Sequence, residues 1–230
     1  MAAVENHLIE LLPDRDRRRL LAVCEPVELQ LAEVLYEQGQ PTSHVYFPLD
    51  GFVSLVAGVD HHPGLEMGMV GREGMLGAQL ALGVTLAPLR ARVQGPGLAR
   101  RISAAAFRRE LAQSEPLQRG LARYIHVLMS QLSTAAACLR FHQIGPRLAR
   151  WLLMSQDRAH ANTFNVTHEF LASMLGVRRV GVTIAAGVLQ HQDLIAYHRG
   201  ELTVCDRAGL EVAACSCYAA DQRAYAELMC

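Results

Sequence analysis

The sequence predicts an α+β protein in which a β-barrel precedes a long helix and a small helical domain with a short β-element. Two observations predict this order. From Val27 to Ile102, short β-rich segments alternate with Gly- and Pro-containing turns about every 8–12 residues, a spacing typical of an all-β sandwich or barrel. After Ser103, the apolar residues recur at helical spacings instead.

The predicted strands of the barrel are short and alternate in polarity. A barrel of this size has an interior that can hold a small ligand. The segments with the strongest β pattern are Val27–Leu31, Val45–Phe47, Phe52–Val56, Leu65–Met69 and Leu89–Val93.

Composition narrows the class of protein. The chain has 230 residues, 51% of them hydrophobic, and 22 basic residues balance 22 acidic ones, which excludes a disordered chain. All basic residues are Arg, and a weak basic excess in the C-terminal half permits a nucleic-acid partner. No apolar run reaches the roughly 20 residues that span a bilayer, and the N-terminus has no signal-peptide pattern, so we expect a cytoplasmic protein without a membrane partner.

Six cysteines are present, and none forms a Cys-x-x-Cys pair. Cys215 and Cys217 fall in a stretch, Ala208–Leu228, that we expect to be one helix. There the two side chains would point about 200° apart and could not chelate together. We therefore expect free buried thiols and no metal site.

A long helix follows Pro116, which suits a first helical position. Its apolar residues favour packing against a second copy of the helix, although a helix that lies on its own barrel remains an alternative. The expected domains are a sensory barrel over 1–115, a dimerisation helix over 116–140 and a DNA-binding domain with a helical tail over 141–230. The apolar seam consists of Leu121, Ile125, Leu128, Leu132, Ala135 and Leu139, at alternating spacings of four and three.

The segment from His168 to Gly187 predicts a helix-turn-helix. Two short helices that cross steeply need apolar residues at set positions, a small residue at the fifth and Gly at the ninth. All seven positions fit, with Ala172 and Gly176 as the small residue and the turn glycine. The apolar positions are Leu171, Leu175, Val177, Val182 and Ala185.

Two arginines begin the second of these helices. Arg178 and Arg179 lie where helix N–H groups are unpaired and cations are disfavoured by about 0.3–1 kcal/mol each. A phosphate brought to that helix end would reverse the sign, although two solvated arginines on a surface turn remain an alternative. Tyr197–Val204 resembles a wing. We expect DNA contacts from Thr167, His168, Arg178, Arg179, Val180, Thr183, Ile184 and Arg199.

In this order, the elements resemble the cAMP receptor protein/fumarate-nitrate regulator (Crp/Fnr) superfamily of bacterial transcription regulators over roughly residues 15–205. The motifs that carry the resemblance are Tyr36–Gly39, Asp50-Gly51, Val166–Glu169, Leu175–Arg179 and Asp193–Ile195. The resemblance implies a jelly-roll barrel of the cyclic-nucleotide-binding type, a long dimerisation helix and a winged helix-turn-helix. It also implies a homodimer on two-fold symmetric double-stranded DNA, with RNA polymerase as a further partner.

The sequence departs from cyclic-nucleotide-binding members at the effector pocket. Those members carry Gly-Glu and a phosphate-binding Arg, whereas this chain has Gly77-Ala78, with Leu89 at the arginine position. Arg90 is one residue away and faces the opposite side of its strand. We therefore expect no cyclic AMP binding, and the effector is unknown.

Other cofactors of the superfamily receive limited support. Only Cys24 lies near the N-terminus, so we expect no iron–sulfur cluster of the kind that N-terminal cysteines hold. A haem sensor stays open through His61 and His62, although a solvated turn explains these histidines better.

Two rival functions are less favoured. A cupin-like enzyme needs convergent His ligands, and adjacent strand residues such as His61 and His62 would point opposite ways, so we expect no enzyme. A regulator that acts through protein contacts, with a purely structural helix-turn-helix, is the remaining alternative.

Overall fold

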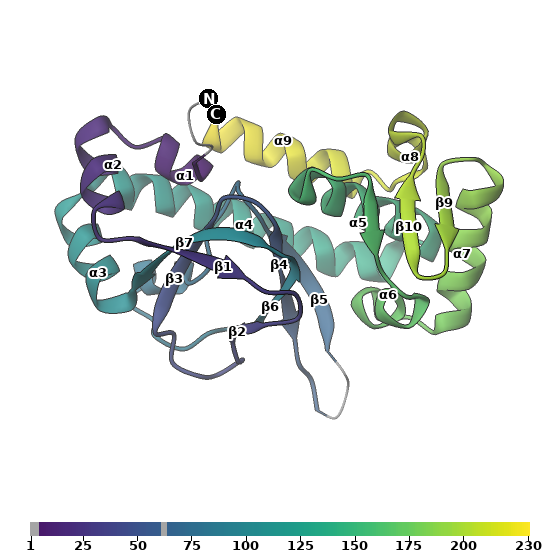
Figure 1. Cartoon of the computed structure of the whole chain (residues 1–230), viewed down its shortest axis with the longest axis horizontal. Coiled ribbons are helices and arrows are strands. Elements are labelled where there is room, and N and C mark those ends of the chain that lie inside the picture. The colour runs from purple at the N-terminus through teal and green to yellow at the C-terminus, as the bar shows by residue number, and fades with distance from the viewer. Residues whose placement is uncertain (1–4, 61–63) are drawn as a thin grey trace.

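The computed structural model describes residues 5–60 and 64–230, and its N-terminal half is a sandwich of two antiparallel sheets (Figure 1). Strands run in the order β1-β7-β3 in one sheet and β2-β6-β4-β5 in the other, which is the expected jelly-roll type of barrel. The strands are β1 (Glu25–Leu29), β2 (Val34–Tyr36), β3 (His44–Pro48), β4 (Phe52–Ala57), β5 (Leu65–Val70), β6 (Arg90–Gly95) and β7 (Gly97–Ser103).

Alternating polarity sets which face of each strand enters the core. Along β6, Ala91 and Val93 are fully buried while Arg90 and Arg92 point away from the core. Val53 of β4 pairs in register with Val93 and is also fully buried. The tight β3–β4 turn needs Gly51, whose φ is +71° and whose missing side chain leaves room for the backbone oxygen of Gly95. The predicted strand pattern is confirmed.

Several helices cover one end of the barrel, and the last of them extends beyond it. Ser114 caps α4 by accepting a hydrogen bond from the Leu117 amide at 3.2 Å, and Pro116 lies in the first turn, as expected. From there α4 runs out past the barrel toward the C-terminal domain (Figure 1). These elements are α1 (His7–Glu10), α2 (Asp14–Leu21), η1 (Ala78–Leu82), α3 (Ala104–Gln113) and α4 (Glu115–Phe141).

The expected dimer seam is only partly available to a second copy. Leu121 and Ala135 are buried within the chain itself, so neither contacts a partner in this conformation. Leu121 belongs to the cluster of buried residues that the barrel shares with the helices beside it, called the barrel-side core. Ile125, Leu128 and Leu132 line a pocket against the barrel. Apolar residues at helical spacing indicate that one face of a helix is buried, but they do not show whether a second copy or the chain's own barrel buries it.

The core of the C-terminal domain also takes in Phe52 and Met69 of the barrel. Residues from each of the domain's elements meet around Trp151 and Leu152 of α5, and Leu202 of β10 is fully buried there. The short strands form one sheet in the order β8-β10-β9. The elements are α5 (Ile144–Ala159), β8 (Thr163–Asn165), α6 (His168–Leu175), α7 (Arg179–His191), β9 (Ile195–His198), β10 (Glu201–Val204) and α8 (Arg207–Ala213).

The tail does not form the single helix expected over Ala208–Leu228. The chain breaks between α8 and α9 (Cys217–Met229), and α9 runs back beside α4 to the barrel (Figure 1). Met229 is buried in the barrel-side core, and the Tyr225 hydroxyl donates a hydrogen bond to the Glu73 carbonyl at 2.7 Å. The tail therefore leaves the C-terminal domain and ties it to the half that contains the barrel.

Among the described residues, no single helix is long and apolar enough to cross a membrane. Only α6 and α7 together pass the same test of length and composition, and they are bent by 108° at the break between them.

Candidate DNA-binding site

The steep crossing of α6 and α7 is the geometric centre of the site. The two helix axes differ in direction by 108° across a break at Gly176, whose φ of +62° ends α6 in the left-handed conformation. Leu171 and Val182 are fully buried at the crossing, as the spacing predicts. The guanidinium of Arg147, on α5, donates a hydrogen bond to the Leu175 carbonyl and so fixes the C-terminal end of α6.

The start of α6 is fastened to the second helix and to the wing. Thr167 caps α6 by accepting a hydrogen bond from the Phe170 amide at 3.1 Å. His168 Nδ1 lies 3.0 Å from Thr183 Oγ1, and the imidazole ring stacks on Tyr197 with 4.6 Å between ring centroids. These contacts hold α6, α7 and β9 in one rigid unit.

His168, which we expect to contact phosphate, is held by Thr183 and Tyr197 in this structure. Its Nε2 atom is buried and has no hydrogen-bond partner among the described residues. Burial, with the nearby Arg179 cation, lowers the pKa of His168, so the neutral ring is favoured. The side chain positions α7 and the wing, and other residues form the exposed surface of the site.

Arg178 and Arg179 are the exposed cations of the site. Arg178 is the N-cap residue of α7, and its side chain makes no capping hydrogen bond. In the described part of the chain, neither guanidinium forms an ion pair within 4.0 Å, and no acidic residue lies in the first turn of α7. The positive end of the helix and both cations therefore face solvent without a counterion.

The rest of the exposed face of α7 is mostly apolar. Val180 and Ile184 are 68% and 64% exposed, and Val188 continues the stripe. Thr183 is exposed, but its hydroxyl lies 3.1 Å from the Arg179 carbonyl and is held within the helix. This face borders a groove of about 1010 Å³ whose opposite wall belongs to the β4–β5 hairpin.

A tight hairpin forms the wing. Strands β9 and β10 pair antiparallel and are joined by Arg199-Gly200, both with positive φ, as a two-residue turn requires. Arg199 is exposed at this tip. The structure thus places Thr167, Arg178, Arg179, Val180, Thr183, Ile184 and Arg199 on exposed positions of one small domain, with His168 beneath them.

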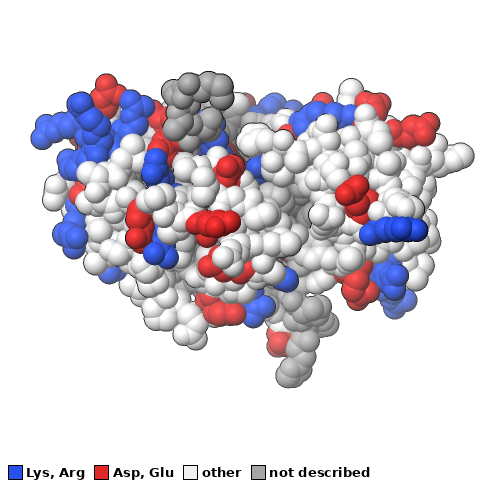
Figure 2. Space-filling model, in the orientation of Figure 1, with Lys and Arg blue, Asp and Glu red and all other residues white. Residues whose placement is uncertain are grey.

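Positive charge is not concentrated on the C-terminal domain in the face of the molecule that Figure 2 shows. Arginines gather most densely at the opposite end, over the helices that begin the chain. On this face, attraction of DNA would depend on a few placed cations rather than on a broad basic patch.

A pocket lies between the barrel and α4, where an effector is expected. It has a volume of about 190 Å³, and Gly77, Ala78 and Leu89 line it together with apolar residues of α4. Arg90 does not line it, because this side chain points outward and pairs with Glu37 at 2.8 Å. The pocket therefore offers an anion no cation from these strands. His61 and His62 lie outside the described residues.

Two groups of functional interest were not predicted from the sequence. Arg147 was not singled out, because its role depends on a carbonyl 28 residues away. Likewise, the tail brings Cys215 and Cys217 together beside Cys138 and His142, which corrects the expectation that these two cysteines cannot act on one ligand. The thiols are free, as expected, but Cys205 and Cys230 are exposed rather than buried. Cys215 lies before α9 rather than within it, so the angle expected between Cys215 and Cys217 does not apply.

Comparisons with known proteins agree with this architecture. The family of Crp-like helix-turn-helix domains matches residues 146–213. FixK2 from Bradyrhizobium japonicum is 15% identical with a TM-score of 0.69, and the match covers 84% of this chain and 98% of FixK2. The c-di-GMP responsive global regulator CLP from Xanthomonas campestris is 17% identical with a TM-score of 0.68, over 84% of this chain and 100% of CLP.

A third structure, a CRP-family transcriptional regulator from Thermus thermophilus, is 20% identical with a TM-score of 0.66, over 82% of this chain and 96% of its own. None of the curated protein sequences matches the chain. The CLP protein and the Thermus thermophilus protein are described as regulators. The resemblance is thus confirmed: the chain carries a Crp-like helix-turn-helix domain on the fold of Crp/Fnr transcription regulators.

Proposed function

We propose that the protein is a homodimeric transcription regulator that binds double-stranded DNA sequence-specifically through α7. The observation that carries this proposal is the pair Arg178 and Arg179 at the uncapped, exposed start of that helix. Without a partner, two cations at the positive end of a helix dipole destabilise the fold. A phosphate backbone removes this cost, and a bend of 108° between α6 and α7 suits a helix-turn-helix that inserts its second helix into a major groove.

Each exposed side chain of the domain has a role on such DNA. Arg178 and Arg179 pair with phosphate or with guanine edges, while Val180 and Ile184 contact thymine methyl groups. Arg199 at the wing tip and the backbone amides after Thr167 bind phosphates, which fix the position of the domain without reading sequence. Because α7 has an apolar face with few hydrogen-bonding groups, the sequence read is rich in A·T pairs.

The two-fold symmetry of such a DNA site suits a dimer of the protein. Two copies related by a two-fold axis place two α7 helices in successive major grooves, about 34 Å apart. The outward face of α4, where Met129 is 62% exposed, is the surface for the second copy. RNA polymerase is a further partner in this proposal, and the cytoplasm is the compartment.

The effector in this proposal is a small apolar molecule. The 190 Å³ pocket is lined mainly by aliphatic side chains, and its wall includes Ile125, Leu128 and Leu132 of α4. A ligand there would touch the barrel and the dimerisation helix together. Cyclic AMP is excluded from the proposal, because Ala78 and Leu89 occupy the positions of the carboxylate and the arginine that would hold it.

Selection of bound fragments from random duplex DNA, followed by affinity measurements over a range of salt concentrations, tests the proposal. We expect one enriched two-fold symmetric sequence. The logarithm of the association constant should fall linearly with the logarithm of salt concentration, by about 0.9 for each phosphate neutralised. Absence of enrichment together with a flat salt response would contradict DNA binding.

A second candidate is a regulator that acts through protein contacts. The exposed apolar stripe of Val180, Ile184 and Val188 on α7 favours it, because exposed apolar surface is common at protein interfaces. In that case the same titration shows only weak binding to DNA. Replacement of the three stripe residues by Ser then weakens binding to the protein partner and leaves binding to DNA unchanged.

A further inference from the structure

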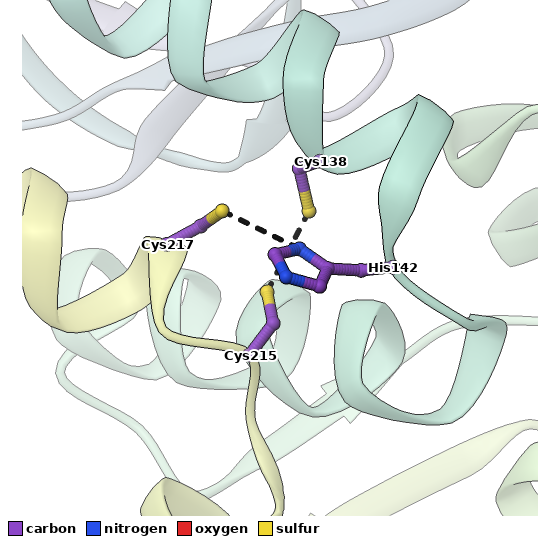
Figure 3. A group of neighbouring side chains, drawn as sticks. All are labelled: Cys138, His142, Cys215 and Cys217. Atoms are coloured by element: carbon purple, nitrogen blue, oxygen red, sulfur yellow. Dashed lines mark hydrogen bonds between the residues drawn. The ribbon is translucent and has the colours of Figure 1, made fainter.

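Four side chains with soft and borderline metal-ligand atoms meet where the long helix joins the C-terminal domain (Figure 3). Cys138 lies in the last turn of α4, and His142 directly follows that helix as its C-cap residue. Cys215 lies in the connection between α8 and α9, and Cys217 is the first residue of α9. The sulfur and nitrogen atoms point toward one another from three separate segments (Figure 3).

The spacing of these atoms suits one tetrahedral ion. Zinc–sulfur and zinc–nitrogen bonds of about 2.3 and 2.0–2.1 Å place neighbouring ligand atoms of a tetrahedron about 3.5–3.8 Å apart. Here the sulfurs of Cys138 and Cys215 are 3.5 Å apart, as are the sulfur of Cys217 and His142 Nδ1. All four ligand atoms lie within 4.8 Å of one another. A cluster of several iron atoms would need its sulfurs farther apart.

The electrostatic surroundings supply a second, independent observation. Arg147 is only 8% exposed, and its guanidinium donates a hydrogen bond to the Leu175 carbonyl. Within the described residues, no carboxylate lies within ion-pair distance of it, and it lines one small pocket together with Cys138 and Arg150. An unpaired buried cation is costly. Three thiolates and one divalent ion carry a net charge of −1, which is the counterion that Arg147 lacks.

We propose that Cys138, His142, Cys215 and Cys217 bind one Zn²⁺ ion, which fastens the C-terminal tail to the junction of α4 and α5. Binding releases the three thiol protons and forms three zinc–sulfur bonds and one zinc–nitrogen bond, without any change of oxidation state. Cys-x₃-His from one end of α4 and Cys-x-Cys from the tail complete a closed site, which is typical of structural zinc.

The site has a mechanical consequence. Because α9 runs back to the barrel, with Asp221 paired to Arg150 at 2.6 Å and Met229 in the barrel-side core, the ion fixes one end of a strap whose other end is already anchored. With Zn²⁺ bound, the C-terminal domain is held in a fixed orientation on α4. Removal of the ion frees that end of the strap.

The test uses the full chain, purified under reducing conditions from zinc-supplemented cells. Mass spectrometry of the intact native protein and elemental analysis should find one zinc per chain. After exchange to Co²⁺, the protein should show the visible absorption of a tetrahedral ion together with thiolate-to-cobalt charge transfer. Competition with a chromogenic chelator should show that Cys138→Ser or Cys215→Ser weakens zinc affinity by at least about 100-fold.

Matched controls are available within the chain. Cys205 and Cys230 are exposed and lie outside the cluster, so Cys205→Ser and Cys230→Ser should retain one zinc with unchanged affinity. His142→Cys keeps four ligands and should retain the ion with stronger cobalt charge transfer. This variant serves if a serine variant fails to fold.

Several outcomes would overturn the proposal. They are a wild-type protein that takes up neither Zn²⁺ nor Co²⁺ under reducing conditions, a metal content that Cys215→Ser leaves intact, or a mass two hydrogens lower that shows a Cys138–Cys215 disulfide instead. None of these results depends on DNA binding, so a failure here is distinct from a failure of the proposed function.

Discussion

Helix α7 and the pocket between the barrel and α4 differ in how their arginines are paired. At the start of α7, Arg178 and Arg179 are exposed and lack carboxylate partners within the described residues. At the pocket, Arg90 is turned out of the barrel and paired with Glu37 at 2.8 Å, and the lining is apolar. Two unpaired cations at the positive end of a helix favour an external anion, whereas Arg90 is already paired outside the pocket.

The comparison separates what the fold fixes from what individual positions decide. Both regions keep the architecture of Crp/Fnr regulators, and the seven helix-turn-helix positions keep their residue types. In the pocket, by contrast, substitution at two positions, Ala78 and Leu89, removes the charged groups. Chains that share a fold therefore share its architecture more reliably than they share a ligand.

The largest expected effect is that of Arg178→Ala combined with Arg179→Ala. We expect at least about 100-fold weaker DNA binding and a salt slope smaller by about 3–4, since a dimer would lose four phosphate contacts. Thermal stability should stay the same or rise, because two cations leave the positive end of α7. Gel-shift titrations with Arg15→Ala/Arg18→Ala as the control check this. A double variant that unfolds would show instead that the arginines are structural.

The contact between the two halves predicts a pH dependence. Glu66 of β5 accepts hydrogen bonds from Trp151 Nε1 at 2.9 Å and from Ser54 Oγ at 2.5 Å. Burial raises the pKa of Glu66 to about 7, and the Ser54 and Trp151 hydrogen bonds oppose the shift, as do Arg158 and Arg150.

Because the folded state holds this proton more tightly than the unfolded state, Glu66 contributes stability at low pH. That contribution is lost as the pH rises from about 4.5 to about 7, and we expect a loss on the order of 1–3 kcal/mol. Urea unfolding at pH 5.5 and pH 8 should show it, and Glu66→Gln should remove the difference. An equal pH dependence in both proteins would refute the assignment to Glu66.

A smaller effect is expected at the turn of the helix-turn-helix. Gly176 has a φ of +62°, and an added Cβ would lie 2.6 Å from Leu65 Cδ1 of the barrel. We expect Gly176→Ala to destabilise the domain by about 1–2 kcal/mol.

Two controls separate the backbone strain from the contact with the barrel. Leu65→Ala in the same chain should relieve only the contact. Gly187→Ala lies in open space within α7 and should stabilise the protein by about 0.5–1 kcal/mol, because glycine is unfavourable inside a helix. Chemical denaturation of all four proteins measures these differences, and equal stability of Gly176→Ala and wild type would contradict the argument.

The smallest expected effect is that of cyclic AMP. A ligand that binds the folded state raises its melting temperature by mass action. Because none of the described residues that line the 190 Å³ pocket is charged, we expect no shift in thermal unfolding with saturating cyclic AMP. A rise of several degrees would show that the pocket binds the nucleotide without the family's charged groups.

Local spacing was sufficient to predict much of the fold and of the reading surface. The helix-turn-helix could be predicted because its positions lie within 20 residues, where helical geometry fixes which side chains meet. The outward direction of Arg90 followed from the alternation of side chains along one strand. The identity of α7 as an exposed helix with unpaired cations was likewise a local property.

Only the tertiary structure decided which distant groups meet. It placed Leu121 inside the barrel-side core, turned His168 toward Thr183 and Tyr197, and returned α9 along α4. It also brought Cys215 to within 3.5 Å of Cys138, 77 residues earlier in the chain. The periodicity of apolar residues indicates that a face is buried but not which surface buries it, because burial energy depends on area and not on the identity of the partner.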